Sequence, residues 1–359
     1  MNVVCVSLDG LHSGMLGAFG NAWIQTPTLN SLAAQSVLFD RYYAETLDLQ
    51  QTFERYADGL TGGEPNDASN GSQPVAEWQR KIFITDDSDI FLHPFADVFD
   101  ERHRLARFGG TKPAAALEET QFFKTFAVAT DILDSVKIGD ESFFLWLHLE
   151  AFRGNWDFPL QYRELYRDTK DPEAYTGTTL PEKGKRHGSI DPDELQSVME
   201  AYSGGVTVFD DVLAGLVEYV DNLHDTALVI LSTRGFSLGE HGRIGANDDL
   251  YGENVQLPLM IRFPKKPTHY GEEYRFATYR SQSLLQPQDF FSLISANEIP
   301  EEPAAVHQTL HIGKALLTPD WFLTETGELY SKPDDRWETN NVAARCRRIV
   351  EELTGVRSN

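Results

Sequence analysis

The sequence has few cysteines, no long apolar run and no excess of basic residues. Two cysteines, Cys5 and Cys346, occur among 359 residues, too few for a disulfide framework or a cysteine-based zinc site. The absence of any apolar run of about 18 residues argues against a transmembrane helix. Lys and Arg number 31 against 55 Asp and Glu, which gives a net charge of −24. Nucleic acids and anionic membranes are therefore poor partners, because both are polyanions, and an anionic ligand would need a local basic pocket.

The N-terminal residues predict a strand of the fold, not a targeting segment. Residues 1–8 lack a basic region and a small-residue cleavage site, and residues 3–8 form a β-branched apolar run. The chain as given is therefore expected in the cytoplasm. Its 41% apolar and 24% charged residues are typical of a globular protein.

Short apolar runs alternate with helical segments along the chain. Strands are predicted at residues 3–8, 37–39, 81–85, 142–149 and 227–232, and helices at residues 27–33, 117–136 and about 191–222. This alternation predicts an α/β fold with a mainly parallel central sheet and helices on both faces.

Two units are expected. Residues 1–267 would form the α/β domain, and residues 268–359, which have fewer long apolar runs, a smaller C-terminal α+β unit packed on it. Residues 62–75 and 167–190 are polar and rich in Gly or Pro, which predicts loops.

Polar residues follow the ends of the predicted strands. Asp9 follows the first, and residues 85–87, 148–153 and 233–234 follow three others. The carboxyl ends of parallel strands meet at one edge of a sheet, where ligands of such folds bind. We therefore expect a functional site at that edge.

Three segments resemble the sulfatase family of the alkaline-phosphatase superfamily. Residues 8–39 (LDGL, LGAFG, TPTL, then Phe39) resemble the family's N-terminal block. Residues 232–264 (STRGFSLGEHG, LYGE, LPLMIRFP) resemble its "SDHGxxLGEHG" block. Residues 327–341 (GELY, then Asp, Glu and Asn) resemble its C-terminal pattern. The three blocks lie in the family's order over nearly the whole chain, which implies the sulfatase fold.

The resemblance implies a divalent cation, usually Ca²⁺, held by an Asp-Asp pair and by Asp with His or Asn. Those four positions are Asp9, Gly10, Thr233 and Arg234 here, so Asp9 is the only remaining ligand. Such a cation takes about six oxygen ligands, and Arg234 places a permanent positive charge in its position. We predict no cofactor, with Ca²⁺ only if the site survives in altered form. An Asp9–Arg234 ion pair in place of the metal and a simple loss of the site both fit.

The family nucleophile is a Cys or Ser some ten residues before a Thr-Gly pair. Counting back from Thr61 gives Thr52, with Glu54 at the family's Pro position and Arg55 one residue early for its Arg. Formylglycine cannot form from Thr, although phosphotransferring branches of the superfamily use Thr itself. The alternative is that Thr52 is an ordinary residue near a helix start, and without a metal or base its hydroxyl is a poor nucleophile.

The basic residues that the resemblance implies are also changed. Arg153 follows Phe152 where the family has Pro-His, and residues 85–89 carry no Lys or His. Arg55, Arg153 and Arg234 could converge on one pocket and bind an oxyanion. Alternatively, they pair with carboxylates of their own chain: Asp9, Glu54, Asp86 or Glu150.

Two functions follow from these changes. The first is a sulfatase-like pseudoenzyme with a binding or regulatory role, which takes a small anionic ligand at Asp9, Arg153 and Arg234 or a protein partner. The second is a divergent sulfuric- or phosphoric-ester hydrolase, which uses Thr52 or an activated water with Arg55 and Arg153. His241 of the LGEHG block is expected to be structural.

Overall fold

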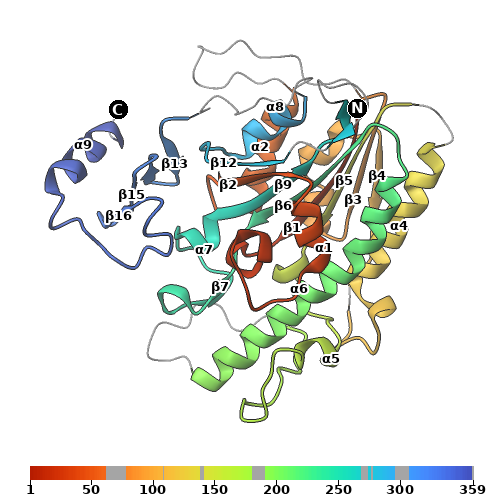
Figure 1. Ribbon diagram of the computed structural model, residues 1–359, viewed down its shortest axis with the longest axis horizontal. Helices are drawn as coiled ribbons and strands as arrows, with labels where there is room; N and C mark the ends of the chain where they lie inside the picture. Colours follow the sequence, from red (N-terminus) through yellow and green to blue (C-terminus); the bar gives the residue numbers. More distant parts are fainter. Residues whose placement is uncertain are drawn as a thin grey trace.

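An eight-stranded sheet forms the centre of the protein. The computed structural model describes residues 1–61, 78–107, 109–137, 141–179, 191–267, 274–275, 278–295 and 307–357. Across the sheet the strands are β12 (Tyr279–Ser281), β2 (Val37–Tyr43), β9 (Gln256–Arg262), β6 (Thr226–Arg234), β1 (Asn2–Asp9), β5 (Phe143–Leu149), β3 (Arg80–Thr85) and β4 (Glu101–Arg104). Only β9 runs antiparallel to its neighbours, β6 and β2. The predicted mainly parallel α/β fold is confirmed (Figure 1).

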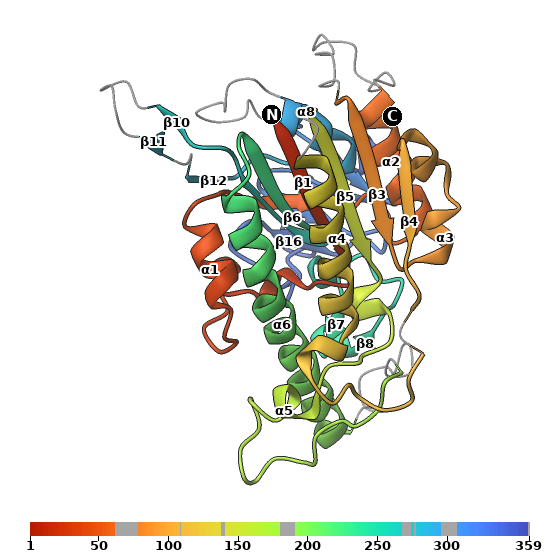
Figure 2. The same ribbon diagram turned by 90° about the vertical axis from the view of Figure 1, so that its right-hand side faces the viewer.

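Helices cover both faces of this sheet. In β1, Val4 and Val6 face one hydrophobic core, while Val3 and Cys5 face the other, so the strand is a continuous apolar run. The first face is covered by α1 (Pro27–Ala33), α4 (Gln121–Lys137) and α6 (Pro192–Asp221), which Figure 2 shows in front of the sheet. The second is covered by α2 (Leu49–Thr61), α3 (Ser88–Phe91) and α8 (Phe290–Ser295).

The long helix α6 follows its sequence signals. The Asp191 side chain caps it by accepting from the Asp193 backbone N–H, and Pro192 occupies the first turn. The helix ends at Asp221, in agreement with the predicted 191–222. Shorter elements complete this part: α5 (Leu160–Arg163), α7 (Gly252–Val255), and the strand pairs β7 (Ser237–Leu238) with β8 (Ile244–Gly245) and β10 (Lys266–Pro267) with β11 (Tyr274–Arg275).

A second, antiparallel sheet lies near the C-terminus. It contains β13 (Leu310–Ile312), β14 (Ala315–Leu317), β15 (Trp321–Leu323) and β16 (Leu329–Ser331), and α9 (Arg347–Arg357) follows it. The predicted boundary at residue 267 precedes β12 and α8, which pack with the main sheet. The predicted loop at residues 62–75 lies outside the described residues, as does the end of 167–190. Within the described ranges, no helix has the length and apolarity needed to cross a membrane.

The LGEHG block joins the main sheet to the C-terminal unit. The His241 ring stacks on Tyr251 at a centroid distance of 3.7 Å. Its Nδ1 lies 3.0 Å from Glu253 Oε1, and its Nε2 lies 3.2 Å from the carbonyl oxygen of Glu338. Glu338 in turn forms a buried ion pair with Lys332. The contacts of His241 are therefore structural.

We expect His241 to stabilise the fold most at acidic pH. Burial alone would lower its pKa, but the hydrogen-bonded Glu253 carboxylate raises it to about 9, above the ordinary value of about 6.5. The stabilisation is therefore complete below about pH 6.5 and is lost as the pH rises to about 9. Urea unfolding of the wild type and His241→Gln should differ more near pH 6 than near pH 9.5, and equal differences would contradict this assignment.

Candidate functional site

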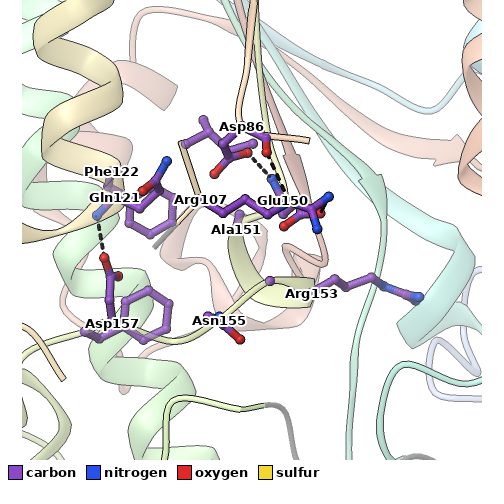
Figure 3. Close-up of a pocket in the computed structure, with 12 residues that line it drawn as sticks. Asp86, Arg107, Gln121, Phe122, Glu150, Ala151, Arg153, Asn155 and Asp157 are labelled. Atoms are coloured by element: carbon purple, nitrogen blue, oxygen red, sulfur yellow. Dashed lines mark hydrogen bonds and ion pairs between the residues drawn. The ribbon is translucent and has the colours of Figure 1, made fainter. Parts of the chain in front are cut away.

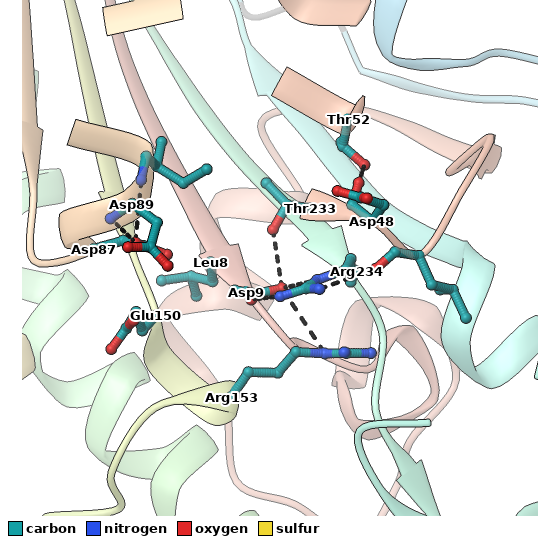
Figure 4. Close-up of polar contacts among 12 residues, drawn as sticks. Leu8, Asp9, Asp48, Thr52, Asp87, Asp89, Glu150, Arg153, Thr233 and Arg234 are labelled. Carbon is teal, nitrogen blue, oxygen red and sulfur yellow. Dashed lines mark hydrogen bonds and ion pairs between the residues drawn. The ribbon is translucent and has the colours of Figure 1, made fainter. Parts of the chain in front are cut away.

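The candidate site lies at the carboxyl edge of the sheet, where β1 and β6 end side by side (Figure 4). Leu8 is opposite Ser232, but Asp9 is opposite Arg234, because the register shifts after Leu8. Thr233 is thus an extra residue on β6. A bulge of this kind re-aims side chains at the end of a strand, and here it brings Arg234 to Asp9.

Arg234 binds Asp9 through two parallel hydrogen bonds. Its Nε donates to Oδ1 at 2.9 Å, and its Nη2 donates to Oδ2 at 2.5 Å. The Thr233 hydroxyl donates to the same Oδ1 at 3.2 Å. The remaining Arg234 nitrogen, Nη1, donates to the carbonyl oxygen of Leu47 at 2.9 Å. Both carboxylate oxygens are therefore used by protein donors, in the two-pronged geometry that makes such pairs strong.

The electrostatics of the pair favour its charged form. Burial alone would raise the pKa of Asp9, but the charge and hydrogen bonds of Arg234, with smaller effects of Arg153 and His148, hold it below its usual value. For Arg234, burial acts to lower the pKa and the Asp9 charge more than offsets it, so the pKa is raised. Both groups are therefore ionised at neutral pH.

Arg153 fills the space beside Gly10. Its Nε and Nη2 donate to the carbonyl oxygen of Gly235 at 3.1 and 2.9 Å, and its Nε lies 3.9 Å from Asp9 Oδ1. Burial lowers the pKa of Arg153 to about 10. Gly10 has a φ of +85°, and a Cβ at this position would lie 2.8 Å from Arg153 Cγ. The glycine is thus required by the close approach of Arg153.

The four positions that the resemblance assigns to the family's metal site do not fit a divalent cation. Asp9 supplies the only carboxylate, and both its oxygens already accept from Arg234. Gly10 has no side chain, and the Thr233 hydroxyl is committed to Asp9. The Arg234 guanidinium stands against the carboxylate that would bind the cation, and it would repel that cation. Throughout the described residues, no group of three or more His, Cys, Asp or Glu side chains could hold a metal ion.

Thr52 and Arg55 lie on α2, away from Asp9. The Thr52 side chain is buried, and its hydroxyl donates to the Asp48 carbonyl one helical turn earlier at 3.0 Å. Arg55 is on the surface, where its Nε donates to Glu45 Oε2 at 2.5 Å and a weaker pair joins it to Asp58. Neither residue lines the cavity over Asp9. Their catalytic roles stay predictions that these contacts do not support.

The sequence interpretation missed the residues at the start of α2. Asp48 caps this helix, because its Oδ1 accepts from the backbone N–H of Gln50 at 2.9 Å and of Gln51 at 3.3 Å. Thr46 and Asp48 both line the cavity over Asp9. The signal was present, since an Asp before a helical segment is a common N-cap.

The cavity over the Asp9–Arg234 pair has a volume of about 790 Å³ and a surplus of carboxyl groups. Both of its arginines, Arg153 and Arg234, are already bound to protein oxygens. Besides Asp9, five acidic residues line it: Asp48, Asp87, Asp89, Glu150 and Asp248. Such a lining disfavours an anion.

A second cavity of about 270 Å³ adjoins the first, and Glu150 and Arg153 line both (Figure 3). Its walls carry three carboxyl groups with raised pKa values. Burial, with the nearby Asp87 and Asp86, raises the pKa of Glu150 to about 8, although Arg107 contacts it. Burial raises the pKa of Asp86 and of Asp157 to about 6. Asp86 and Glu150 lie in the strand-end segments where the sequence predicts a functional site, whereas Asp157 was not recognised from the sequence.

Comparisons with known proteins agree with this fold. The sulfatase family model matches residues 92–295. Iduronate 2-sulfatase of Mus musculus is 19% identical over 336 residues, which cover 74% of this chain, and the chain spans 59% of the length of that relative. A phosphonate monoester hydrolase of Agrobacterium radiobacter has a TM-score of 0.68 at 16% identity, over 99% of this chain and 94% of its own. A 2-O GAG sulfatase has a TM-score of 0.62 at 13% identity, over 100% and 92%. The chain therefore belongs to the sulfatase family of the alkaline-phosphatase superfamily.

Proposed function

We propose that this protein is a sulfatase-fold pseudoenzyme with a binding or regulatory role. The observation that carries the proposal is the guanidinium of Arg234, which takes both oxygens of Asp9 in the position of the family's cation. Ester hydrolysis in this family needs a cation that activates the nucleophile and neutralises charge in the transition state. A guanidinium supplies charge but has no open coordination position, and it is never deprotonated to act as a base.

The residues near α2 give this proposal further support. A hydroxyl nucleophile needs an adjacent base or a metal. The Thr52 hydroxyl donates to a backbone carbonyl. The Thr46 oxygen accepts from the Asp48 backbone N–H at 3.1 Å. The acidic cavity would also repel a sulfate or phosphate ester.

The test is thermal unfolding of the full chain with and without Ca²⁺, Mg²⁺, Mn²⁺ and Zn²⁺, beside metal analysis of the same sample. A site filled at about 100 times its Kd would stabilise the folded state by roughly 2.7 kcal/mol and raise Tm by a few degrees. We expect no shift and no stoichiometric metal. A clear shift with bound metal would overturn the proposal.

The double variant Thr233→Asp, Arg234→Asp provides the matched comparison. It removes the guanidinium and places two carboxylates beside Asp9, because the Thr233 side chain already faces Asp9. We expect this variant to gain a Ca²⁺-dependent rise in Tm that the wild type lacks. A folded double variant with no response to Ca²⁺ would contradict our account of why the wild type binds none.

The alternative is a divergent ester hydrolase that works without a metal. The structural likeness to a phosphonate monoester hydrolase and the raised pKa of Glu150, about 8, favour testing it, because a protonated carboxyl group can serve as a general acid. Aryl sulfate, aryl phosphate and phosphonate monoesters are the substrates to try. Turnover that is lost in Thr52→Val or Glu150→Gln would support the hydrolase and count against the pseudoenzyme.

A further inference from the structure

A third cavity of about 400 Å³ is lined by residues of β2, β9 and β12 and by residues 332–336 of the C-terminal segment. It does not share any lining residue with the cavity over Asp9. Its lining differs from that of the cavity over Asp9 in the sign of its charge. Four basic side chains line it, against one carboxylate, Asp40. The four are Arg41, Arg280, Lys332 and Arg336. In a chain with a net charge of −24, this concentration of positive charge calls for a physical explanation.

Two of the four basic groups are neutralised by protein carboxylates. Arg280 takes both oxygens of Asp40, with Nε 3.0 Å from Oδ2 and Nη2 2.5 Å from Oδ1. Lys332 forms its ion pair with the buried Glu338. Asp40 also accepts from the Gln282 side chain at 2.6 Å. The only carboxylate of the lining is therefore already bound to Arg280 and Gln282.

Arg41 and Arg336 donate to carbonyl oxygens and not to carboxylates, and Arg336 also lies over the Trp337 ring. Arg41 Nη2 donates to the Thr318 carbonyl at 3.0 Å, and Arg336 Nη1 donates to the Phe19 carbonyl at 2.7 Å. In the parts of the chain that the structure describes, neither has a carboxylate within ion-pair distance. Arg41 is only 7% exposed. Burying a guanidinium without a bound counter-charge is unfavourable. Burial, with a smaller effect of Arg280, lowers the pKa of Arg336, although the nearby charge of Asp40 acts in the opposite direction.

We propose that this cavity binds the oxyanion of a small molecule, a phosphate or sulfate group, through Arg41 and Arg336. Each guanidinium bonds a carbonyl through one nitrogen, and its other N–H groups can form the two-pronged contacts that suit tetrahedral oxyanions. The cavity lies within the size range of small-molecule sites and exceeds what a bare ion needs. Phe19 and Pro333 also line it and would contact an organic body that carries the anion.

This site is separate from the Asp9–Arg234 pair, and the inference does not depend on loss of catalysis. A protein with a net charge of −24 needs a local concentration of basic residues to bind an anion. This cavity has such a concentration. Arg41 belongs to the main sheet, whereas Arg336 follows the C-terminal sheet. A bound anion would therefore hold the two parts together, and its binding should stabilise the C-terminal segment.

The test is calorimetry and thermal unfolding of the full chain with inorganic phosphate, inorganic sulfate and a hexose 6-phosphate, each against chloride at equal ionic strength. Two charge-assisted contacts predict saturable binding with a Kd of about 1 mM for the bare ions. Tighter binding of the sugar phosphate would identify an organic ligand, and equal binding a free oxyanion. No saturable effect beyond that of chloride would overturn the proposal.

Single substitutions test whether the anion binds in this cavity. Arg336→Gln should weaken it by about tenfold or more, whereas Arg348→Gln, the same change at an exposed residue of α9, should leave it unaltered. Because Arg41→Gln could fail to fold, Gln282→Glu serves as a second variant: this side chain lines the cavity at an exposed position, and the added carboxylate should repel the anion. Binding at wild-type strength in both Arg336→Gln and Gln282→Glu would overturn the proposal.

Discussion

Replacing Arg234 with Met is expected to lower the free energy of unfolding by about 3–5 kcal/mol, because the variant leaves the Asp9 carboxylate buried without its partner. The Asp9 side chain is only 3% exposed and lies 3.9 Å from its next nearest cation, Arg153. Urea unfolding at neutral pH measures the loss. Arg55→Met provides the matched control, since Arg55 pairs with carboxylates at the surface, where such pairs contribute about 0–1 kcal/mol.

The double variant Asp9→Leu, Arg234→Met separates the pair from the charge that remains. Removing both charges takes away the unpaired Asp9 carboxylate, and Arg153 keeps its hydrogen bonds to the Gly235 carbonyl oxygen, so the double variant should be more stable than Arg234→Met alone. Acid should also reduce the difference in the free energy of unfolding between the wild type and Arg234→Met. The folded pKa of Asp9 is lowered from 3.8, so the stabilisation by the pair is present above about pH 4 and is lost as the pH falls through the folded pKa. A difference that is independent of pH would contradict this account.

Replacing Arg163 with Met should lower the free energy of unfolding by a similar amount to Arg234→Met, although Arg163 belongs to α5 and not to the end of a strand. This side chain is fully buried and donates to four carbonyl oxygens at 2.6–2.9 Å. The acceptors belong to a segment without regular structure: Trp156, Phe158, Tyr175 and Gly177. Hydrogen bonds to charged groups contribute about 1.5–3 kcal/mol each, and buried carbonyls left without donors add a cost. We expect a loss of roughly 3–5 kcal/mol.

Limited proteolysis should show that unfolding of the Arg163→Met variant begins in this segment. Arg163→Met should expose residues 164–179 to cleavage before the main sheet unfolds, because the stretch has little regular structure and loses its bonds from Arg163 to Tyr175 and Gly177. Arg163→Lys is the informative comparison. It keeps the charge, but its ammonium has three donors on one atom and cannot reach four carbonyls around a plane, so its stability should be intermediate. Wild-type stability in Arg163→Lys would show that charge alone is needed.

The central fold was predictable because its strands are buried on both faces. Residues 3–8 and 142–149 are continuous apolar runs, and the structure has β1 and β5 there. Strand β4 was not predicted. It is a four-residue edge strand, Glu-Arg-His-Arg, with one neighbour only, and an edge strand needs no apolar pattern. Strand β12 was not predicted either, because it is a short strand at the other edge of the sheet.

The site was partly predictable. The resemblance implies that cation ligands are replaced at Gly10, Thr233 and Arg234, and the predicted Asp9–Arg234 pair is present in the structure. The role of Arg153 as the side chain that fills the space beside Gly10 was not predictable, because no sequence pattern encodes contact between residues 143 positions apart. The same holds for Arg163, since a buried arginine bound only by carbonyls has no partner residue type to search for.

The close contact between Gly10 and Arg153 bears on whether the change at the metal site can be reversed. A single mutation to Asp at position 10 would place its Cβ 2.8 Å from Arg153 Cγ and 3.1 Å from Phe152 Cβ, and would force a non-glycine residue to a φ of +85°. Restoring an Asp at position 10 would therefore be unfavourable until Arg153 is replaced. Under the proposed function, recovery of an Asp-Asp pair at the end of the first strand would have to begin at Arg153, a residue that is not itself a cation ligand.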